Sequence, residues 1–137
     1  MGLDMYLIGD DYIPTCTDQT RPQRDGYEVT SYRLRLGYWR KHAPLHQHII
    51  QTYADNKDDC REIHLDAEQL MEIAKALRER ALPPNNECAG CFFGDTKWWD
   101  ELRDEGAEHA KVFERAAQWL DSEQTDTWRS VYYQASW

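Results

Sequence analysis

The alternation of hydrophobic and polar residues predicts β-strands at both ends of the chain. Residues 3–8 read Leu-Asp-Met-Tyr-Leu-Ile, which places large side chains on both faces of an extended segment. Residues 129–136 alternate again and predict a final strand. After the first strand, turn-forming and polar residues predominate, so we expect a long loop over residues 9–26.

The clearest strand pattern covers residues 27–40. Successive side chains of a strand point to opposite faces, so the alternation assigns each residue to one of two sides. One face is predicted to carry Tyr32, Leu34, Leu36 and Tyr38, and the other Arg33, Arg35 and Trp39.

Three segments show the helical spacing of hydrophobic residues. Pro44 suits the first turn of a helix, and Leu45, Ile49 and Tyr53 follow at intervals of four. A second helix is predicted to begin with a capping box at Asp66 and to end before Pro83. A third helix is predicted within residues 98–120. The hydrophobic stripes of these last two helices are Leu70, Ile73, Ala74, Leu77 and Ala81, and Val112, Phe113, Ala116 and Leu120.

Two further segments complete the predicted order of elements. Residues 60–65 form a short strand, and residues 92–94 a short buried strand or turn. The order is β-β-α-β-α-β-α-β, and the first two strands have no helix between them. An α+β fold is therefore expected, with a mixed or mainly antiparallel sheet of about four to five strands and three helices packed mainly on one face. Without repeats or a Gly/Ser-rich linker, residues 1–137 are predicted to be a single domain.

Composition excludes several classes of protein. Hydrophobic residues make up 41% of the chain and aromatic residues 12%, which is too much for a disordered protein. No apolar run reaches the roughly 18 residues of a membrane helix, and the acidic residues near the N-terminus are not typical of a signal peptide. We therefore expect a cytoplasmic protein whose four cysteines are thiols. A net charge of −9 argues against binding to duplex nucleic acid.

The charge is unevenly distributed along the sequence. Residues 29–54 contain no acid, although they include Arg33, Arg35, Arg40, Lys41 and three histidines. A basic segment in so acidic a chain is suited to hold a small anion or an acidic partner. The alternative is that these cations form ion pairs with the acidic third helix.

Four sequence blocks resemble a family of small uncharacterised proteins encoded by bacteriophages, prophages and their bacterial hosts. The blocks are Met-Gly-Leu-Asp-Met-Tyr-Leu at residues 1–7, Gly-Tyr-Trp-Arg-Lys-His at 37–42 with Leu45-His46, Asp-Asp-Cys-Arg-Glu-Ile at 58–63, and Ser-Val-Tyr-Tyr-Gln-Ala-Ser-Trp at 130–137. The resemblance implies a phage-type protein of the host cytoplasm. Members are sometimes labelled phosphoglycerate kinase, which we reject because this chain has no glycine-rich phosphate loop.

Metal and redox chemistry have few candidate residues. Cys88 and Cys91 form one Cys-x-x-Cys pair, whereas a structural zinc site needs four ligands, and Cys16 and Cys60 have no paired spacing. His42, His46 and His48 offer imidazoles near the first helix, where surface or capping contacts are more usual. Cys60 beside Arg61 is a candidate nucleophile only if His46 or His64 serves as its base. We therefore expect reduced thiols, no metal and no cofactor.

The strongest constellation combines cations with aromatic and amide groups. These groups suit a planar anion with a ring, because guanidinium binds phosphate and aromatic faces stack on bases. We expect Arg40 and Arg61 to share a concavity with Trp39 and Tyr132. The alternative is that the charged residues form surface ion pairs and the aromatic residues belong to the core. The predicted ligand-binding residues are Trp39, Arg40, Lys41, His42, His46, Arg61, Glu62, Tyr132 and Gln134.

Three classes of function follow from this constellation. A small binding module for an anionic, nucleotide-like ligand or a host protein is favoured. A small hydrolase or transferase acting on a phosphorylated nucleotide is an alternative, although no residue is assigned a catalytic role. A structural or assembly protein is the third. The sequence leaves the ligand, the host partner and the oligomeric state open.

Overall fold

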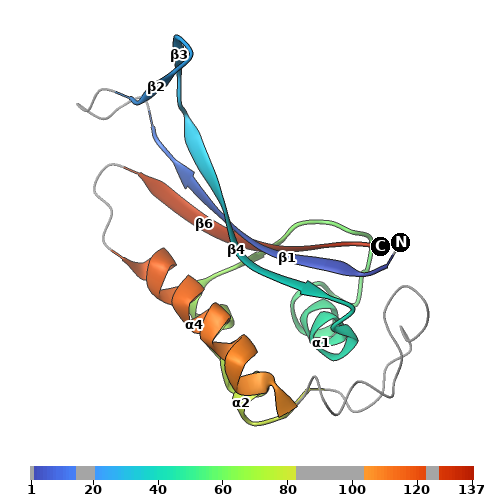
Figure 1. The fold of residues 1–137 in the computed structure, drawn as a ribbon. Coiled ribbons are helices and arrows are strands. Elements are labelled where there is room, and N and C mark those ends of the chain that lie inside the picture. The colour runs from blue at the N-terminus through green and yellow to red at the C-terminus, as the bar shows by residue number, and fades with distance from the viewer. Residues whose placement is uncertain (1, 15–20, 83–103, 123–126) are drawn as a thin grey trace.

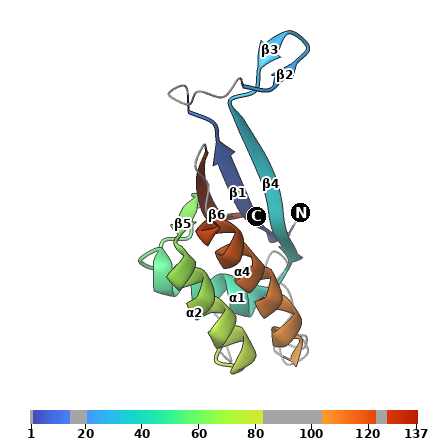
Figure 2. The ribbon, with the colours of Figure 1, turned by 90° about the vertical axis from the view of Figure 1, so that its left-hand side faces the viewer.

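The fold is an α+β arrangement of an antiparallel sheet with helices on one side (Figures 1 and 2). The computed structural model describes residues 2–14, 21–82, 104–122 and 127–137. In these ranges, four strands form the main sheet in the order β4-β1-β6-β5, and every neighbouring pair is antiparallel. The predicted class and the mainly antiparallel sheet are confirmed. The strands are β1 (Asp4–Tyr12), β4 (Ser31–Arg40), β5 (Ile63–Leu65) and β6 (Trp128–Ser136).

Three helices of the described ranges cover one face of this sheet. They are α1 (Ala43–Tyr53), α2 (Ala67–Arg78) and α4 (Gly106–Asp121). The predicted capping box is present, since the Asp66 carboxylate accepts from the Gln69 backbone N–H at 2.8 Å and the Gln69 side chain accepts from the Asp66 N–H at 2.9 Å. None of the helices in the described part of the chain combines the length and apolar character that crossing a bilayer requires.

The C-terminal segment is part of the centre of the sheet. Strand β6 pairs along its whole length with β1 and, through Val131 to Tyr133, with β5. The prediction of a strand at residues 129–136 is confirmed, with Trp128 as one more residue at its start. Residues 92–94 lie outside the described ranges.

Strand β1 is longer than predicted. It continues through the polar residues 9–12, which we expected to belong to a loop. Pairing with a strand on each side satisfies the backbone of this polar segment and outweighs its low strand propensity. A two-stranded ribbon, β2 (Gln23–Arg24) and β3 (Tyr27–Glu28), turns at Asp25 and Gly26, whose φ angles are 53° and 83°. Figure 1 shows this ribbon projecting beyond the end of the sheet.

A β-bulge in β4 changes the predicted faces of that strand. Leu7 lies opposite Gly37, but Ile8 lies opposite Arg35, so Leu36 is an extra residue. Alternation therefore changes phase at Leu36, and Tyr38 lies on the same side of the sheet as Arg33 and Arg35. The prediction that placed Tyr38 with Leu34 and Leu36, and Trp39 with the two arginines, is wrong for this reason.

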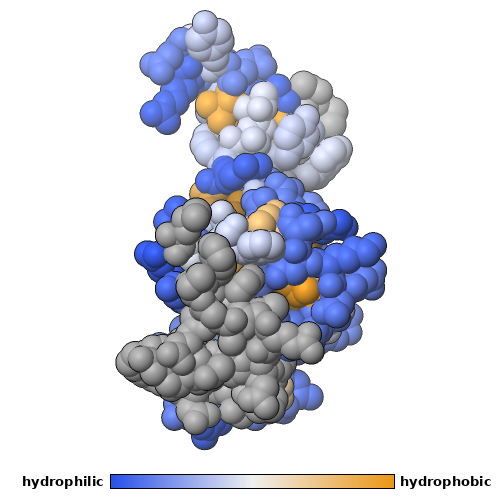
Figure 3. All heavy atoms as spheres, turned by 90° about the vertical axis from the view of Figure 1, so that its right-hand side faces the viewer, coloured by the Kyte–Doolittle hydropathy of each residue, from blue (hydrophilic) through white to orange (hydrophobic). Residues whose placement is uncertain are grey.

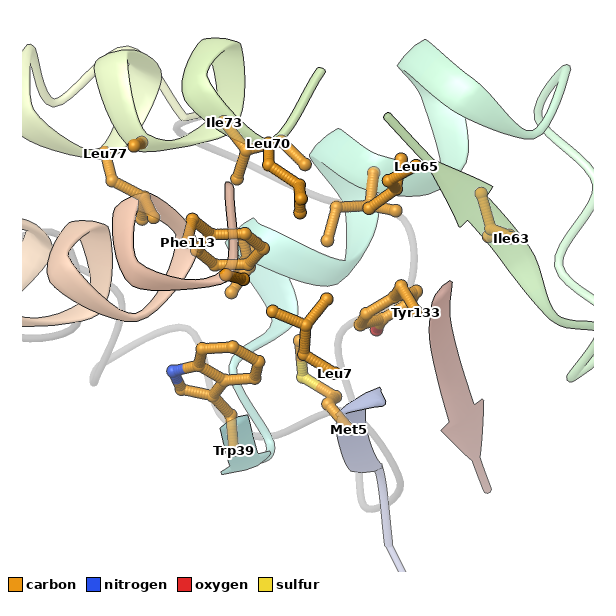
Figure 4. Close-up of a cluster of buried hydrophobic side chains, with 14 of the residues drawn as sticks. Met5, Leu7, Trp39, Ile63, Leu65, Leu70, Ile73, Leu77, Phe113 and Tyr133 are labelled. Atoms are coloured by element: carbon orange, nitrogen blue, oxygen red, sulfur yellow. The ribbon is translucent and has the colours of Figure 1, made fainter. Parts of the chain in front are cut away.

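The hydrophobic core lies between the sheet and the three helices (Figure 4). Met5 and Leu7 of β1 and Tyr133 of β6 point toward the helices, and Phe113 of α4 stacks on Trp39 with ring centroids 5.2 Å apart. Helices α2 and α4 approach closely at Gly106, where a Cβ atom would lie 2.1 Å from the carbonyl oxygen of Leu77. Only glycine fits at this contact.

Candidate functional site

The side of the sheet that faces away from the helices carries aromatic and charged groups. We call this side the outer face. Strand alternation, with the bulge at Leu36, assigns to it Tyr6, Ile8, Asp10 and Tyr12 of β1, Arg33, Arg35, Tyr38 and Arg40 of β4, Trp128, Ser130, Tyr132 and Gln134 of β6, and His64 of β5. Figure 3, seen from the right-hand side of Figure 1, shows that hydrophilic residues predominate among the coloured atoms of that view and that hydrophobic residues form only small patches there.

Arg35 lies against two tyrosine rings on this face. Its guanidinium carbon is 5.5 Å from the ring centroid of Tyr6 and 5.6 Å from that of Tyr38. The rings are themselves in contact, with centroids 5.3 Å apart. The Tyr38 hydroxyl donates to Asp4 at 2.6 Å, and this bond raises the pKa of the phenol. Arg35 forms no ion pair with a described residue, and the faces of the two rings hold its guanidinium in place.

A second cluster lies next to the first, across β1. Arg33 donates to both carboxylate oxygens of Asp10, with its Nε 3.0 Å from Oδ1. The same guanidinium lies 5.8 Å from the ring centroid of Tyr132, which also contacts the His64 ring at 5.5 Å. Tyr132 is almost fully covered by these neighbours. Here the cation already has an anionic partner.

The far end of the outer face carries an exposed aromatic pair. The rings of Tyr12 and Trp128 lie 5.9 Å apart, and the residues are 42% and 66% exposed. Next to them, a hollow of about 270 Å³ is lined by Leu120, Ser122, Thr127, Trp128 and Arg129. Two large rings are thus presented to solvent beside a recess.

The nine predicted binding residues do not converge on one pocket. Strand β1 separates β4 from β6, and β4 and β5 form opposite edges of the sheet. Trp39 faces the helices and Tyr132 faces outward, so the concavity expected for Arg40 and Arg61 beside these rings is not formed. Lys41 follows β4, its φ of 54° turning the chain toward α1.

The predicted residues instead fall into three groups. Arg40, Tyr132 and Gln134 lie on the outer face, where the Gln134 amide donates to the Cys60 carbonyl at 3.1 Å. Arg61 and Glu62 line a hollow of about 210 Å³ beside β5, and Arg61 forms an ion pair with Asp59. Trp39, His42 and His46 are buried on the helix side.

His46 is the centre of a buried hydrogen-bond chain. Its Nε2 lies 2.9 Å from Asp58 Oδ2, and its Nδ1 lies 2.6 Å from the Tyr133 hydroxyl. A carboxylate only accepts, so Nε2–H donates to Asp58 and Nδ1 accepts from Tyr133. Burial lowers the pKa of His46 and raises that of Tyr133. This chain ties α1 and β6 to the loop that precedes β5.

The buried ring of His42 contacts the half-buried ring of His109. His42 caps α1 by accepting from the Leu45 N–H at 3.3 Å, and burial lowers its pKa to about 3. The ring of His109 lies 4.9 Å away and accepts at Nδ1 from the Trp39 indole N–H at 2.9 Å. Each Nδ1 therefore accepts a hydrogen bond, which leaves the proton on Nε2 and no free lone pair for a metal.

The structure describes only some of the residues on which the metal and thiol predictions depend. In the described ranges, no three histidine, cysteine or acidic side chains come close enough together to hold a metal ion. Cys60 is a half-buried free thiol with a φ of 61°. Cys16, Cys88 and Cys91 lie outside the described residues.

Sequence reasoning missed much of the outer face. The predicted ligand-binding residues did not include Tyr6, Tyr12, Tyr38 and Trp128. Aromatic residues at alternate positions of a strand could have indicated that they share one face of the sheet. The alternative pairing of the basic segment with the acidic third helix is also absent from the described residues, where Arg33 binds Asp10 of β1.

Comparison of the chain with models of protein families, with curated proteins and with solved structures gives no match.

Proposed function

We propose that the protein is a small binding module, a phage-type accessory protein, whose outer face captures an anionic ligand with a planar ring, of the nucleotide class. The observation that carries this proposal is the position of Arg35. Its guanidinium lies against the rings of both Tyr6 and Tyr38 and has no carboxylate partner among the described residues. A cation held in this way is ready to bind an anion from solution.

The guanidinium of Arg35 and the ring of Tyr38 suit the phosphate and the base of a nucleotide, respectively. Guanidinium binds phosphate with two parallel hydrogen bonds, and little side-chain entropy is lost when the rings already hold the arginine. The ring of Tyr38, which is 45% exposed, offers a stacking surface for a base. Arg40 supplies a second cation on the same strand, about 13 Å away.

The charge of the outer face contrasts with that of the whole chain. Arg33, Arg35 and Arg40 balance Asp4, Asp10 and, at the β5 edge, Glu62 on a chain whose net charge is −9. The two aspartates are already engaged, Asp10 by Arg33 and Asp4 by the Tyr38 hydroxyl. An incoming anion therefore meets less repulsion here than an average part of the surface would give.

Capture is better supported than catalysis. The Asp58–His46–Tyr133 chain has the order of an acid–base relay, but His46 and Tyr133 are both fully buried and do not reach a substrate. On the outer face, the nearest histidine–carboxylate pair, His64 with Glu62, is separated by 3.8 Å. The groups that do reach solvent bind anions and rings.

The test is a calorimetric titration of mononucleotides into the wild-type protein and into an Arg35→Gln variant. We expect the variant to bind about ten- to a hundredfold more weakly, the usual loss of one charge-assisted contact. Arg78→Gln is the matched control, because Arg78 is also exposed and lies on α2, behind the sheet. If no nucleotide binds wild type at millimolar concentration, or if both variants bind as wild type does, the proposal is wrong.

A further inference from the structure

We infer that the ligand of the outer face is a short single-stranded stretch of nucleic acid, about four nucleotides long, rather than a single nucleotide. This inference rests on the proposed function and specifies its ligand.

Aromatic groups follow one another along the two central strands. Tyr6 lies near one end of β1, Tyr132 lies opposite Ile8, and Tyr12 lies opposite Trp128 at the other end. With a rise of about 3.3 Å per residue, Tyr6 and Tyr12 are about 20 Å apart. That distance is far longer than one nucleotide. Rings that reach solvent lie at its two ends, Tyr38 beside Tyr6 at one and Tyr12 with Trp128 at the other, while Tyr132 between them is covered by Arg33 and His64.

The arginines run parallel to these rings along the β4 edge. Arg40, Arg35 and Arg33 lie opposite Asp4, Ile8 and Asp10 of β1, so neighbouring cations are separated by about 13 Å and about 7 Å. Phosphates along the edge strand and bases over the central strands would use both rows at once. This division is the arrangement by which sheets bind single strands, with rings stacking the bases and cations following the backbone.

The shape of the face also favours an extended ligand. The hollows of about 210 and 270 Å³ lie at the β5 side and at the Trp128 end, and neither is lined by Arg35 or Tyr38. A single nucleotide that lies on the sheet over Arg35, outside these two hollows, is covered on one side by the strands, whereas small-molecule sites enclose most of the ligand. Linked nucleotides gain affinity because several of them contact rings and arginines of the outer face at the same time.

A duplex does not fit these groups. Paired and stacked bases hide the ring faces that Tyr38 and Trp128 would stack on. The high phosphate density of a duplex would also be repelled by a chain of net charge −9. Because at most three arginines meet phosphates, the affinity for a single strand should fall with salt with a log–log slope of only about −2.

The experiment is a length series of thymidine oligonucleotides, from the mononucleotide to eight units, titrated against wild type by calorimetry. We expect affinity to rise by about tenfold for each base that gains a stacking partner and to level off near four units. Trp128→Ala should weaken binding of the four-unit strand about tenfold and binding of the mononucleotide much less, because the inferred mononucleotide site is at Arg35. Trp128→Phe keeps a ring and should retain most of the affinity, and Arg78→Gln controls for a lost surface charge.

The outcomes separate this inference from the proposed function. If the mononucleotide binds as tightly as the four-unit strand, the inference fails and the proposed function stands. If the folded protein binds neither the mononucleotide nor the four-unit strand, the inference and the proposed function are both wrong, and a protein becomes the candidate partner of this face. Length-dependent binding that is unaffected by Trp128→Ala, or equal binding of a duplex of the same sequence, also overturns the inference.

Discussion

The two sides of the sheet are built from the same four strands and differ in almost every chemical respect. On the helix side, Met5, Leu7 and Tyr133 are fully buried, and His46 among them has two hydrogen-bond partners. On the outer face, Tyr38 and Trp128 remain exposed. One side therefore carries most of the stability, and residues on the other can change with little effect on folding. Substitutions on the two sides should separate loss of folding from loss of binding.

The largest effect is expected from removal of β6. Deleting residues 128–137 takes away the strand between β1 and β5 and exposes the core beneath it. We expect no cooperative melting transition, since the loss exceeds the 5–15 kcal/mol that typically stabilises a domain. Circular dichroism during heating measures this. Trp128→Ala, at the exposed start of the same strand, should melt cooperatively, and a truncated protein that does so as well would show that β6 is dispensable.

A direct comparison of the two sides uses Phe113→Ala and Tyr38→Ala. Phe113 is fully buried against Trp39, so its truncation should lower the free energy of unfolding by about 3–5 kcal/mol. Tyr38 is 45% exposed, and its truncation removes one hydrogen bond to Asp4, so its loss should be much smaller than that of Phe113. Urea denaturation gives both values. Equal losses would mean that the outer face is also part of the folding core.

The buried histidines should make stability depend on pH. The folded-state pKa of His42 is about 3, below its ordinary value of 6.5, so the unfolded chain binds the proton more readily. The stabilising contribution is complete above pH 6.5 and is lost as the pH falls toward 3, by up to about 1.4 kcal/mol per pH unit.

The matched variant is His42→Asn, which keeps an acceptor for the Leu45 N–H at the start of α1 and removes the titrating ring. Urea denaturation between pH 7 and 4 should show a shallower loss of stability than in wild type. A slope identical to that of wild type would show that His42 does not couple folding to protons.

The smallest effect is expected at a helix surface. Arg78 forms a bidentate ion pair with Glu114 between α2 and α4, with Nε 2.6 Å from Oε1, but the pair is partly exposed. Arg78→Ala should lower the free energy of unfolding only slightly, because the pair is open to solvent, and the difference should shrink at high salt. A loss of several kcal/mol would make this pair, and not the sheet, the main link between the helices.

The sequence was informative wherever a local pattern decides the structure. The capping box at Asp66, the last strand and the helical stripes depend on neighbouring residues and could be predicted. The order of the strands depends on contacts between distant segments, and that order separates Arg40 from Arg61. The partners of His46 are equally distant, since Asp58 and Tyr133 are 12 and 87 residues away in the chain. The sequence gives no sign of the extra residue at Leu36. Because this residue decides on which face Tyr38 lies, the position of Tyr38 beside Arg35 was not predicted.

The bulge at Leu36 has a consequence for the outer edge of β4. This strand is ten residues long, and in the four-stranded sheet it pairs only with β1. Long unpaired edges invite a second copy to add its own strand, which leads to aggregation. A bulge interrupts the regular spacing of backbone donors and acceptors, so an incoming strand finds no continuous ladder past residue 36. The residue that aligns the arginines with the tyrosines therefore also protects the protein from associating edge to edge.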